Sequence, residues 1–224
     1  MDINWSMTAK DFQILLDYML NNYKQFQFST YQSPQPATET EFNAALQLLE
    51  AEINENLKKY KSPSPDFIKR MLKHPYFKNS SKKNVLKYCK EIIKQELDFL
   101  AEARKSYEVI VKYPEVKIGP EVLTFLSKGE RTLTFFNEVT TSSVPFYNYS
   151  FPINNENRIY LKERLHANGA LHWEEYYIED FAVFDQNNIC KLAFCTHEQF
   201  LNSNFNDSET KSLTKAGFNA FINQ

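Results

Sequence analysis

The hydrophobic pattern of this chain changes its period near the middle, and that change limits the folds it can adopt. In the first half, apolar residues recur every three to four positions, which is typical of amphipathic helices. In the second half, segments such as 131–139 (RTLTFFNEV) alternate in polarity, which is typical of strands with one buried face. Helices followed by strands predict an α+β fold.

The first half contains four predicted helices. Thr8 and Thr38 each stand three residues before an acidic side chain, the spacing of a capping box. Ser64 can cap a short helix with Pro65 at its first position. The longest helix is expected from about Ser81 to Val111, and its heptad repeat consists of Leu86, Ile93, Leu100 and Tyr107. We expect this repeat to pack within its own domain rather than to form a dimeric coiled coil.

The second half contains predicted antiparallel strands. Strands are expected at 131–139 and at 146–153, the latter near a sheet edge because of its prolines. Asn168-Gly169 favours a type I′ turn and predicts a hairpin over 157–179. Residues 181–184 and 189–195 form another strand pair, and a helix begins near Asp207.

The predicted architecture is therefore α+β, with a helical N-terminal half (a helix hairpin with one long helix), then an antiparallel sheet and covering C-terminal helices. We expect a helical region over 1–112 and a sheet region over 113–224, together in one compact unit.

Several classes of protein are disfavoured by composition. The four glycines are too far apart for a phosphate-binding loop, and no nucleophile motif occurs. Three cysteines do not suggest a disulfide framework, and no apolar run is long enough to span a bilayer. The N-terminus lacks the features of a signal peptide. We expect a cytoplasmic protein without cofactor, metal or membrane.

The charge distribution is the most informative functional feature. Residues 58–94 carry twelve basic side chains and two acidic ones, a local charge of +10, although the whole chain has a net charge of −2. Such segregation is typical of proteins that bind anionic partners. Nearly all these cations are lysines, whereas specific phosphate recognition favours arginine. We therefore expect a protein with an acidic face to bind here, and nucleic acid is the alternative.

An acidic and aromatic run follows at 173–181 (WEEYYIEDF) and could form a second docking surface. The outer face of a paired strand would explain the same run. The residues that we expect to bind a partner, from both segments, are Lys69, Arg70, Lys73, Lys82, Lys83, Lys87, Lys90, Glu175, Glu179 and Asp180.

One constellation could support catalysis. In the predicted hairpin, Glu163 faces Glu174 on the inward side, and His172 lies two residues from Glu174. Two carboxyl groups in a partly buried place can serve as acid and base. A frayed hairpin end, with both glutamates in water, would explain the same residues without catalysis.

These observations predict a non-catalytic protein-binding module that acts through a charged interface, of inhibitor, immunity, adaptor or effector type. A hydrolase that uses Glu163, Glu174 and His172 is one alternative. Nucleic-acid binding through residues 58–94 is the other.

Overall fold

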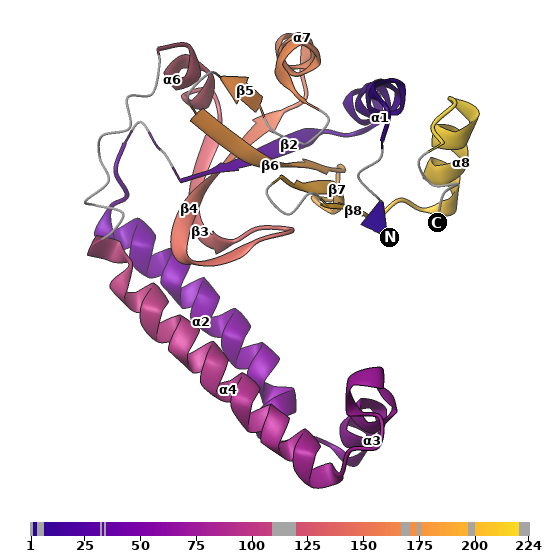
Figure 1. Cartoon of the computed structure of the whole chain (residues 1–224). Coiled ribbons are helices and arrows are strands. Elements are labelled where there is room, and N and C mark those ends of the chain that lie inside the picture. Colours follow the sequence, from indigo (N-terminus) through magenta and orange to yellow (C-terminus); the bar gives the residue numbers. More distant parts are fainter. Residues whose placement is uncertain are drawn as a thin grey trace. The chain divides into compact units, whose positions relative to one another are not determined.

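A computed structural model describes residues 2–3, 7–31, 33, 35–108, 120–166, 171–173, 176–196 and 200–219. The chain divides into two compact units (Figure 1). The sheet unit comprises residues 1–36, 115–141 and 146–224, and the helical unit comprises residues 37–114 and 142–145. The fold is α+β, as the change in hydrophobic period predicts.

The sheet unit is built on antiparallel strands. They are β1 (Asp2–Ile3), β2 (Gln25–Thr30), β3 (Glu130–Phe136), β4 (Thr141–Pro152), β5 (Leu171–Trp173), β6 (Tyr176–Phe184), β7 (Cys190–Cys195) and β8 (Phe200–Ser203). Their order is β1-β8-β7-β6-β2-β4-β3, and β5 pairs with β6. The described helices of this unit are α1 (Ala9–Asn22), α6 (Pro120–Leu126), α7 (Asn155–Arg164) and α8 (Asp207–Lys215).

A column of aromatic rings forms the centre of the sheet unit. Phe26 of β2 stacks on Phe151 of β4, with 5.1 Å between ring centroids. Phe151 stacks on Phe125 of α6 at 4.5 Å, and Phe125 stacks on Tyr160 of α7 at 4.4 Å. Offset stacking of this kind adds to the burial of large apolar side chains. The column therefore fixes α6 and α7 against the sheet.

The helical unit consists of α2 (Glu39–Lys61), α3 (Pro65–Lys73), the 3₁₀ turn η1 (Pro75–Phe77) and α4 (Lys82–Lys105). Figure 1 shows α2 and α4 side by side, with α3 at the end where α2 stops and α4 begins. The predicted helix starts are confirmed: Thr38 forms a capping box with Glu41, and the hydroxyls of Ser64 and Ser81 accept hydrogen bonds from the first turns of their helices. Helix α4 ends at Lys105, where the N–H of Ser106 donates to the carbonyl of Ala103, so the expected continuation of the long helix to Val111 is wrong.

The predicted hairpin over 157–179 is wrong. Residues 155–164 form helix α7, because the Asn154 side chain caps its first turn and because Asn157 and Leu161, four residues apart, are both buried. The hairpin that does form joins β5 to β6, where Leu171 pairs with Ile178 and Trp173 with Tyr176. The predicted turn at residues 168–169 lies outside the described residues.

Two further differences concern the sheet. β4 lies between β2 and the edge strand β3, so residues 146–153 are near an edge, as predicted, but do not form the edge strand itself. Strand β2 comes from a region predicted to be helical, and it pairs with both β4 and β6. The predicted regions 1–112 and 113–224, in one compact unit, stay a prediction. None of the described helices combines the length and the apolar composition needed to cross a membrane.

Candidate functional site

The basic residues of the sequence gather at one end of the helical unit, which we call the basic end (residues 58–94). All twelve of its lysine and arginine side chains are exposed. In the described part of the chain only two of them form ion pairs, Lys58 with Glu55 and Lys87 with Glu91. The other ten charges are therefore available to an external partner.

Helix α4 carries four of these lysines in a stripe. Their spacing of four, three and four residues places them on one helical face, about 16 Å long, and they are Lys83, Lys87, Lys90 and Lys94. The buried residues of α4 include Val85, Cys89 and Leu100, which lie on the opposite face. The helix thus buries one side and presents a line of positive charge on the other.

Charge is distributed unevenly along the helical unit. Residues 37–57, which lead into the basic end, carry five acidic side chains and no basic one. Residues 95–108, which lead out of it, carry four acidic side chains and two basic ones. Because α2 and α4 lie side by side, these acidic stretches form the other end of the helix pair. The unit is positive at one end and negative at the other.

A small core supports the basic end. Ile68, Phe77, Val85 and Cys89 are buried together. Around them, Phe77 contacts Tyr76 and Tyr88 edge-on, at centroid distances of 4.9 and 5.1 Å. Tyr76 is 75% exposed, so an aromatic ring is accessible within the lysine-rich segment.

A pocket of about 540 Å³ opens at the junction of α2 and α3. Its lining residues are Lys59, Tyr60, Ser62, Ser64, Phe67, Arg70 and Met71. Two of them are cations, two carry hydroxyl groups on the linker, and the rest are aromatic or apolar. None of them is acidic. The pocket therefore combines an apolar wall with a positively charged rim.

The three acidic residues that were expected to bind a partner, Glu175, Glu179 and Asp180, have different positions in the structure. Glu175 lies outside the described residues. Glu179 is half-buried in β6 and pairs with Ser29 of β2. Asp180 is only 6% exposed, so its assignment to an exposed docking surface is wrong.

Asp180 instead organises a buried polar network. One carboxylate oxygen accepts hydrogen bonds from the amide of Asn137 and the hydroxyl of Thr140, at 3.1 and 3.0 Å. The other accepts one from the backbone N–H of Thr196 at 3.0 Å. Its own N–H donates to the Thr196 hydroxyl. Its φ of 54° lies in the left-handed region, which aspartate adopts more readily than most residues.

The predicted Glu163, Glu174 and His172 constellation loses its geometric basis. Glu163 is an exposed residue of helix α7, not of a strand. His172 pairs with Tyr177 in the β5–β6 hairpin, and Glu174 lies outside the described residues. The register that would bring the two glutamates face to face does not form, because residues 155–164 are helical.

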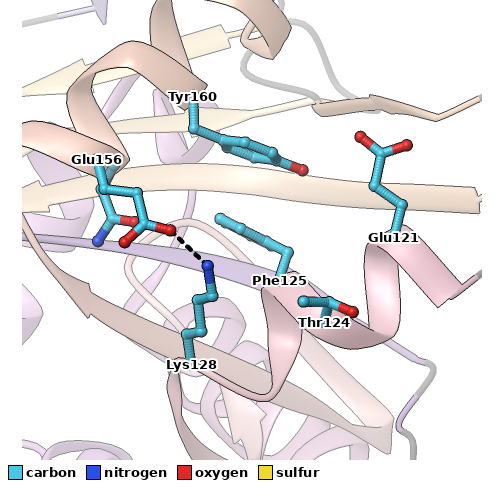
Figure 2. A pocket seen from close by; sticks show the side chains of 7 residues that line it. Glu121, Thr124, Phe125, Lys128, Glu156 and Tyr160 are labelled. Carbon is cyan, nitrogen blue, oxygen red and sulfur yellow. Dashed lines mark hydrogen bonds and ion pairs between the residues drawn. The ribbon is translucent and has the colours of Figure 1, made fainter.

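A second pocket lies in the groove between α6 and α7, with a volume of about 440 Å³ (Figure 2). Figure 2 shows the stacked rings of Phe125 and Tyr160 between Glu121 and the ion pair of Lys128 with Glu156. Burial raises the pKa of the Tyr160 hydroxyl, and the nearby Glu121 carboxylate raises it further. Arg164 binds Glu121 at 2.9 Å, so ion pairs link the two helices at both ends of the ring stack. The ring stack and the ion pairs show that this groove is the packing interface between α6 and α7.

A third pocket, of about 450 Å³, lies beside β7 and includes Glu138, Cys190 and Lys191. Burial, and then the nearby Glu138 carboxylate, raise the pKa of the Cys190 thiol to about 12. Lys191 pairs with Asp185 and Glu209, at 3.8 and 3.3 Å. A protonated thiol is a poor nucleophile at neutral pH, and two carboxylates engage the Lys191 side chain.

Within the part of the chain that the structure describes, no group of three or more histidine, cysteine, aspartate or glutamate side chains could hold a metal ion. Comparison of the chain with family models, with curated proteins and with solved structures finds no match. The pocket at the α2–α3 junction could not be predicted from the sequence, because its walls come together only when α3 folds back at the linker.

Proposed function

We propose that this protein is a protein-binding module whose basic end docks onto an acidic surface of its partner. The observation that carries the proposal is the exposure of all twelve cations of residues 58–94, ten of them without an ion pair among the described residues. The residues expected at the interface are Lys69, Arg70, Lys73, Lys82, Lys83, Lys87 and Lys90. Charge of this density steers association with an oppositely charged surface.

The lysines at the start of α4 are better explained by partner binding than by keeping the helix surface hydrated. Lys82 and Lys83 occupy the first turn of this helix, which has no acidic residue. The partial positive charge of a helix N-terminus disfavours cations there, by roughly 0.3–1 kcal/mol each. The same turn of α2 contains Glu39 and Glu41, as helix stability favours. Residues that weaken their own helix are expected where they serve another purpose.

Nucleic-acid binding is the second candidate, and one observation favours it. The exposed ring of Tyr76 lies in the lysine-rich segment, and single-strand binders combine exposed aromatic rings with basic residues to stack bases. We favour a protein partner because eleven of the twelve cations are lysines, which lack the bidentate geometry of arginine toward phosphate. Among the residues that the structure describes, no geometric observation supports the hydrolase alternative.

The test compares two versions of the α4 stripe. The first variant carries Lys83→Glu, Lys87→Glu, Lys90→Glu and Lys94→Glu, and the matched control carries arginine at the same four positions. Each immobilised protein is incubated with native lysate, in parallel with and without nuclease treatment, and bound proteins are identified by mass spectrometry. Circular dichroism checks that both variants keep the helical content of the wild type.

We expect one stoichiometric partner that the wild type and the arginine control retain and the glutamate variant loses by at least tenfold. Retention of the partner by the glutamate variant would contradict the proposal. Binding that disappears on nuclease treatment would transfer the function to nucleic acid. Failure of the wild type to retain any protein would also count against a protein-binding role.

A further inference from the structure

The pocket at the α2–α3 junction has a definite structural origin. Helix α2 ends at Lys61, and Pro63 and Pro65 prevent the helix from continuing through the linker. The hydroxyl of Ser64 accepts a hydrogen bond from the N–H of Phe67, so a new helix begins at once in another direction. The last turn of α2 and one face of α3 therefore stand on either side of a hollow of about 540 Å³.

The apolar wall of this hollow is preformed. The rings of Tyr60 and Phe67 are perpendicular, with 5.7 Å between their centroids, and Met71 lies one turn beyond Phe67 on α3. All three side chains are half-buried, and they pack against the small core that contains Ile68. A wall that is already ordered loses little conformational entropy when it receives a ligand group.

The polar rim of the hollow is positive. Lys59 and Arg70, both exposed, line it from α2 and α3, and Ser62 provides a hydroxyl on the linker. Lys59 also lies 5.1 Å from the centroid of the Tyr60 ring. The hollow therefore offers an apolar wall and two cations within one site, and such central pockets hold the residues that dominate binding energy in protein interfaces.

We propose that this hollow is the anchoring site of the basic end, and that it takes an acidic protein segment. A large apolar side chain of the segment packs against Tyr60, Phe67 and Met71, and adjacent carboxylates pair with Lys59 and Arg70. This inference rests on the proposed function. It adds that the partner is held by an apolar anchor next to acidic residues, and not by charge alone.

The experiment uses the full chain and two labelled 15-residue peptides of glutamate and glycine. One peptide has phenylalanine at its centre with a glutamate on each side, and the other has serine in place of the phenylalanine. Fluorescence anisotropy measures the dissociation constant of each peptide, and single-stranded DNA of equal net charge is a third probe.

Two protein variants of equal charge are compared. The pocket variant carries Lys59→Glu and Arg70→Glu. The control variant carries Lys61→Glu and Lys73→Glu, which lie in the same last turns of α2 and α3 but do not line the hollow. Both variants lose the same charge at equivalent helix positions. The difference between their affinities for the peptide therefore measures the contribution of the pocket, apart from the overall electrostatic attraction of the basic end.

We expect the wild type to bind the phenylalanine peptide at least tenfold more tightly than the serine peptide. We also expect the pocket variant to lose at least tenfold more affinity than the control variant. Equal losses in the two variants, or equal affinity for the two peptides, would overturn the anchoring site and leave a charge-driven surface intact. Tighter binding of the DNA, or no binding of either peptide, would overturn both the site and the proposed acidic partner.

Discussion

Gly129 lies against the ring of Phe151 so closely that a Cβ atom at position 129 would stand 2.6 Å from the Cζ atom of that ring. Carbon atoms that are not bonded to each other do not approach to this distance in folded proteins. Phe151 cannot move aside freely, because it is stacked between Phe26 and Phe125. The absence of a side chain at position 129 therefore allows the column of stacked aromatic rings to form.

Gly129→Ala is expected to lower the free energy of unfolding of the sheet unit by about 1–3 kcal/mol, the usual cost of overpacking a core. Urea denaturation followed by tryptophan or tyrosine fluorescence measures the change. Glu130→Ala, at the next and exposed position, is the control and should change stability by about 0.5 kcal/mol or less. Equal stability of the two variants would show that the ring column yields without cost.

The Asp180 network predicts a graded response to substitution. Asp180→Asn tolerates the positive φ but turns an N–H₂ group toward one set of donors, so we expect a loss of about 1–3 kcal/mol. Asp180→Ala removes both side-chain acceptor oxygens and adds backbone strain. Its free energy of unfolding should be about 1 kcal/mol lower than that of Asp180→Asn. Chemical denaturation of both variants provides the measurement. An alanine variant as stable as the wild type would mean that the network is not required for the fold.

Asp11 predicts how stability depends on pH. Its buried carboxylate accepts hydrogen bonds from the Thr8 hydroxyl at 2.6 Å and from the N–H of Asn219 at 3.1 Å. The first of these, and then the second, lower the pKa of Asp11 below its ordinary value. The ionised form is favoured in the folded state, so its contribution is present above the ordinary pKa and is lost as the pH falls through the lowered one.

Asp11→Asn should therefore unfold at a lower temperature near neutral pH and show a flatter decline in stability as the pH falls below the ordinary pKa of aspartate. Thermal unfolding over a pH series tests this. Thr8→Ala keeps the carboxyl but removes the hydrogen bond that lowers its pKa most, and should flatten the curve as well. A decline as steep as that of the wild type in both variants would exclude Asp11 as its source.

Cys190 should be unreactive in the folded protein. A pKa of about 12 instead of 9.0 lowers the thiolate fraction at pH 8 about a thousandfold. Isotope-coded iodoacetamide labelling with peptide mass spectrometry reports the three cysteines separately, and urea-unfolded protein gives the reference rate. Glu138→Gln removes the neighbouring negative charge and should accelerate labelling of Cys190. Labelling at the unfolded rate would show that the thiol is neither buried nor electrostatically disfavoured.

Local signals explain what the sequence could predict. The starts of α2, α3 and α4 follow from Thr38, Ser64 and Ser81, whose side chains act on residues three positions away. Segments 181–184 and 189–195 pair as expected because a short turn joins them. The α+β class follows from the period of apolar residues alone, since one buried face is enough to impose it.

Competing local signals and nonlocal packing together explain the errors. Asn168-Gly169 favours a hairpin on its own, but the Asn154 cap and the burial of Asn157 and Leu161 decide for a helix. Strand β2 has the alternating pattern Gln-Phe-Gln-Phe from residue 25, and that short signal becomes a strand only through pairing with β4 and β6. The pattern was visible, but its length could not distinguish a strand from the end of a helix.

Some features of the candidate site could also be predicted from the sequence, and others depend on the packing of distant residues. The charge of residues 58–94 is a property of composition and could be predicted before any fold. The burial of Asp180 could not, because its partners Asn137, Thr140 and Thr196 are distant in sequence. The apolar wall of the hollow requires Tyr60 and Phe67 to meet across the α2–α3 linker, which depends on the direction that α3 takes.

The lysines that open α4 give the basic end one more property. In the free chain, Lys82 and Lys83 repel each other and oppose the helix dipole, so the first turns of α4 are expected to open more often than its middle. A bound anionic segment would hold these turns closed. Binding of the partner and closing of the first turns of α4 are then coupled, so each favours the other. The backbone amides of residues 85–90 should therefore exchange with deuterium markedly more slowly once the acidic peptide is bound.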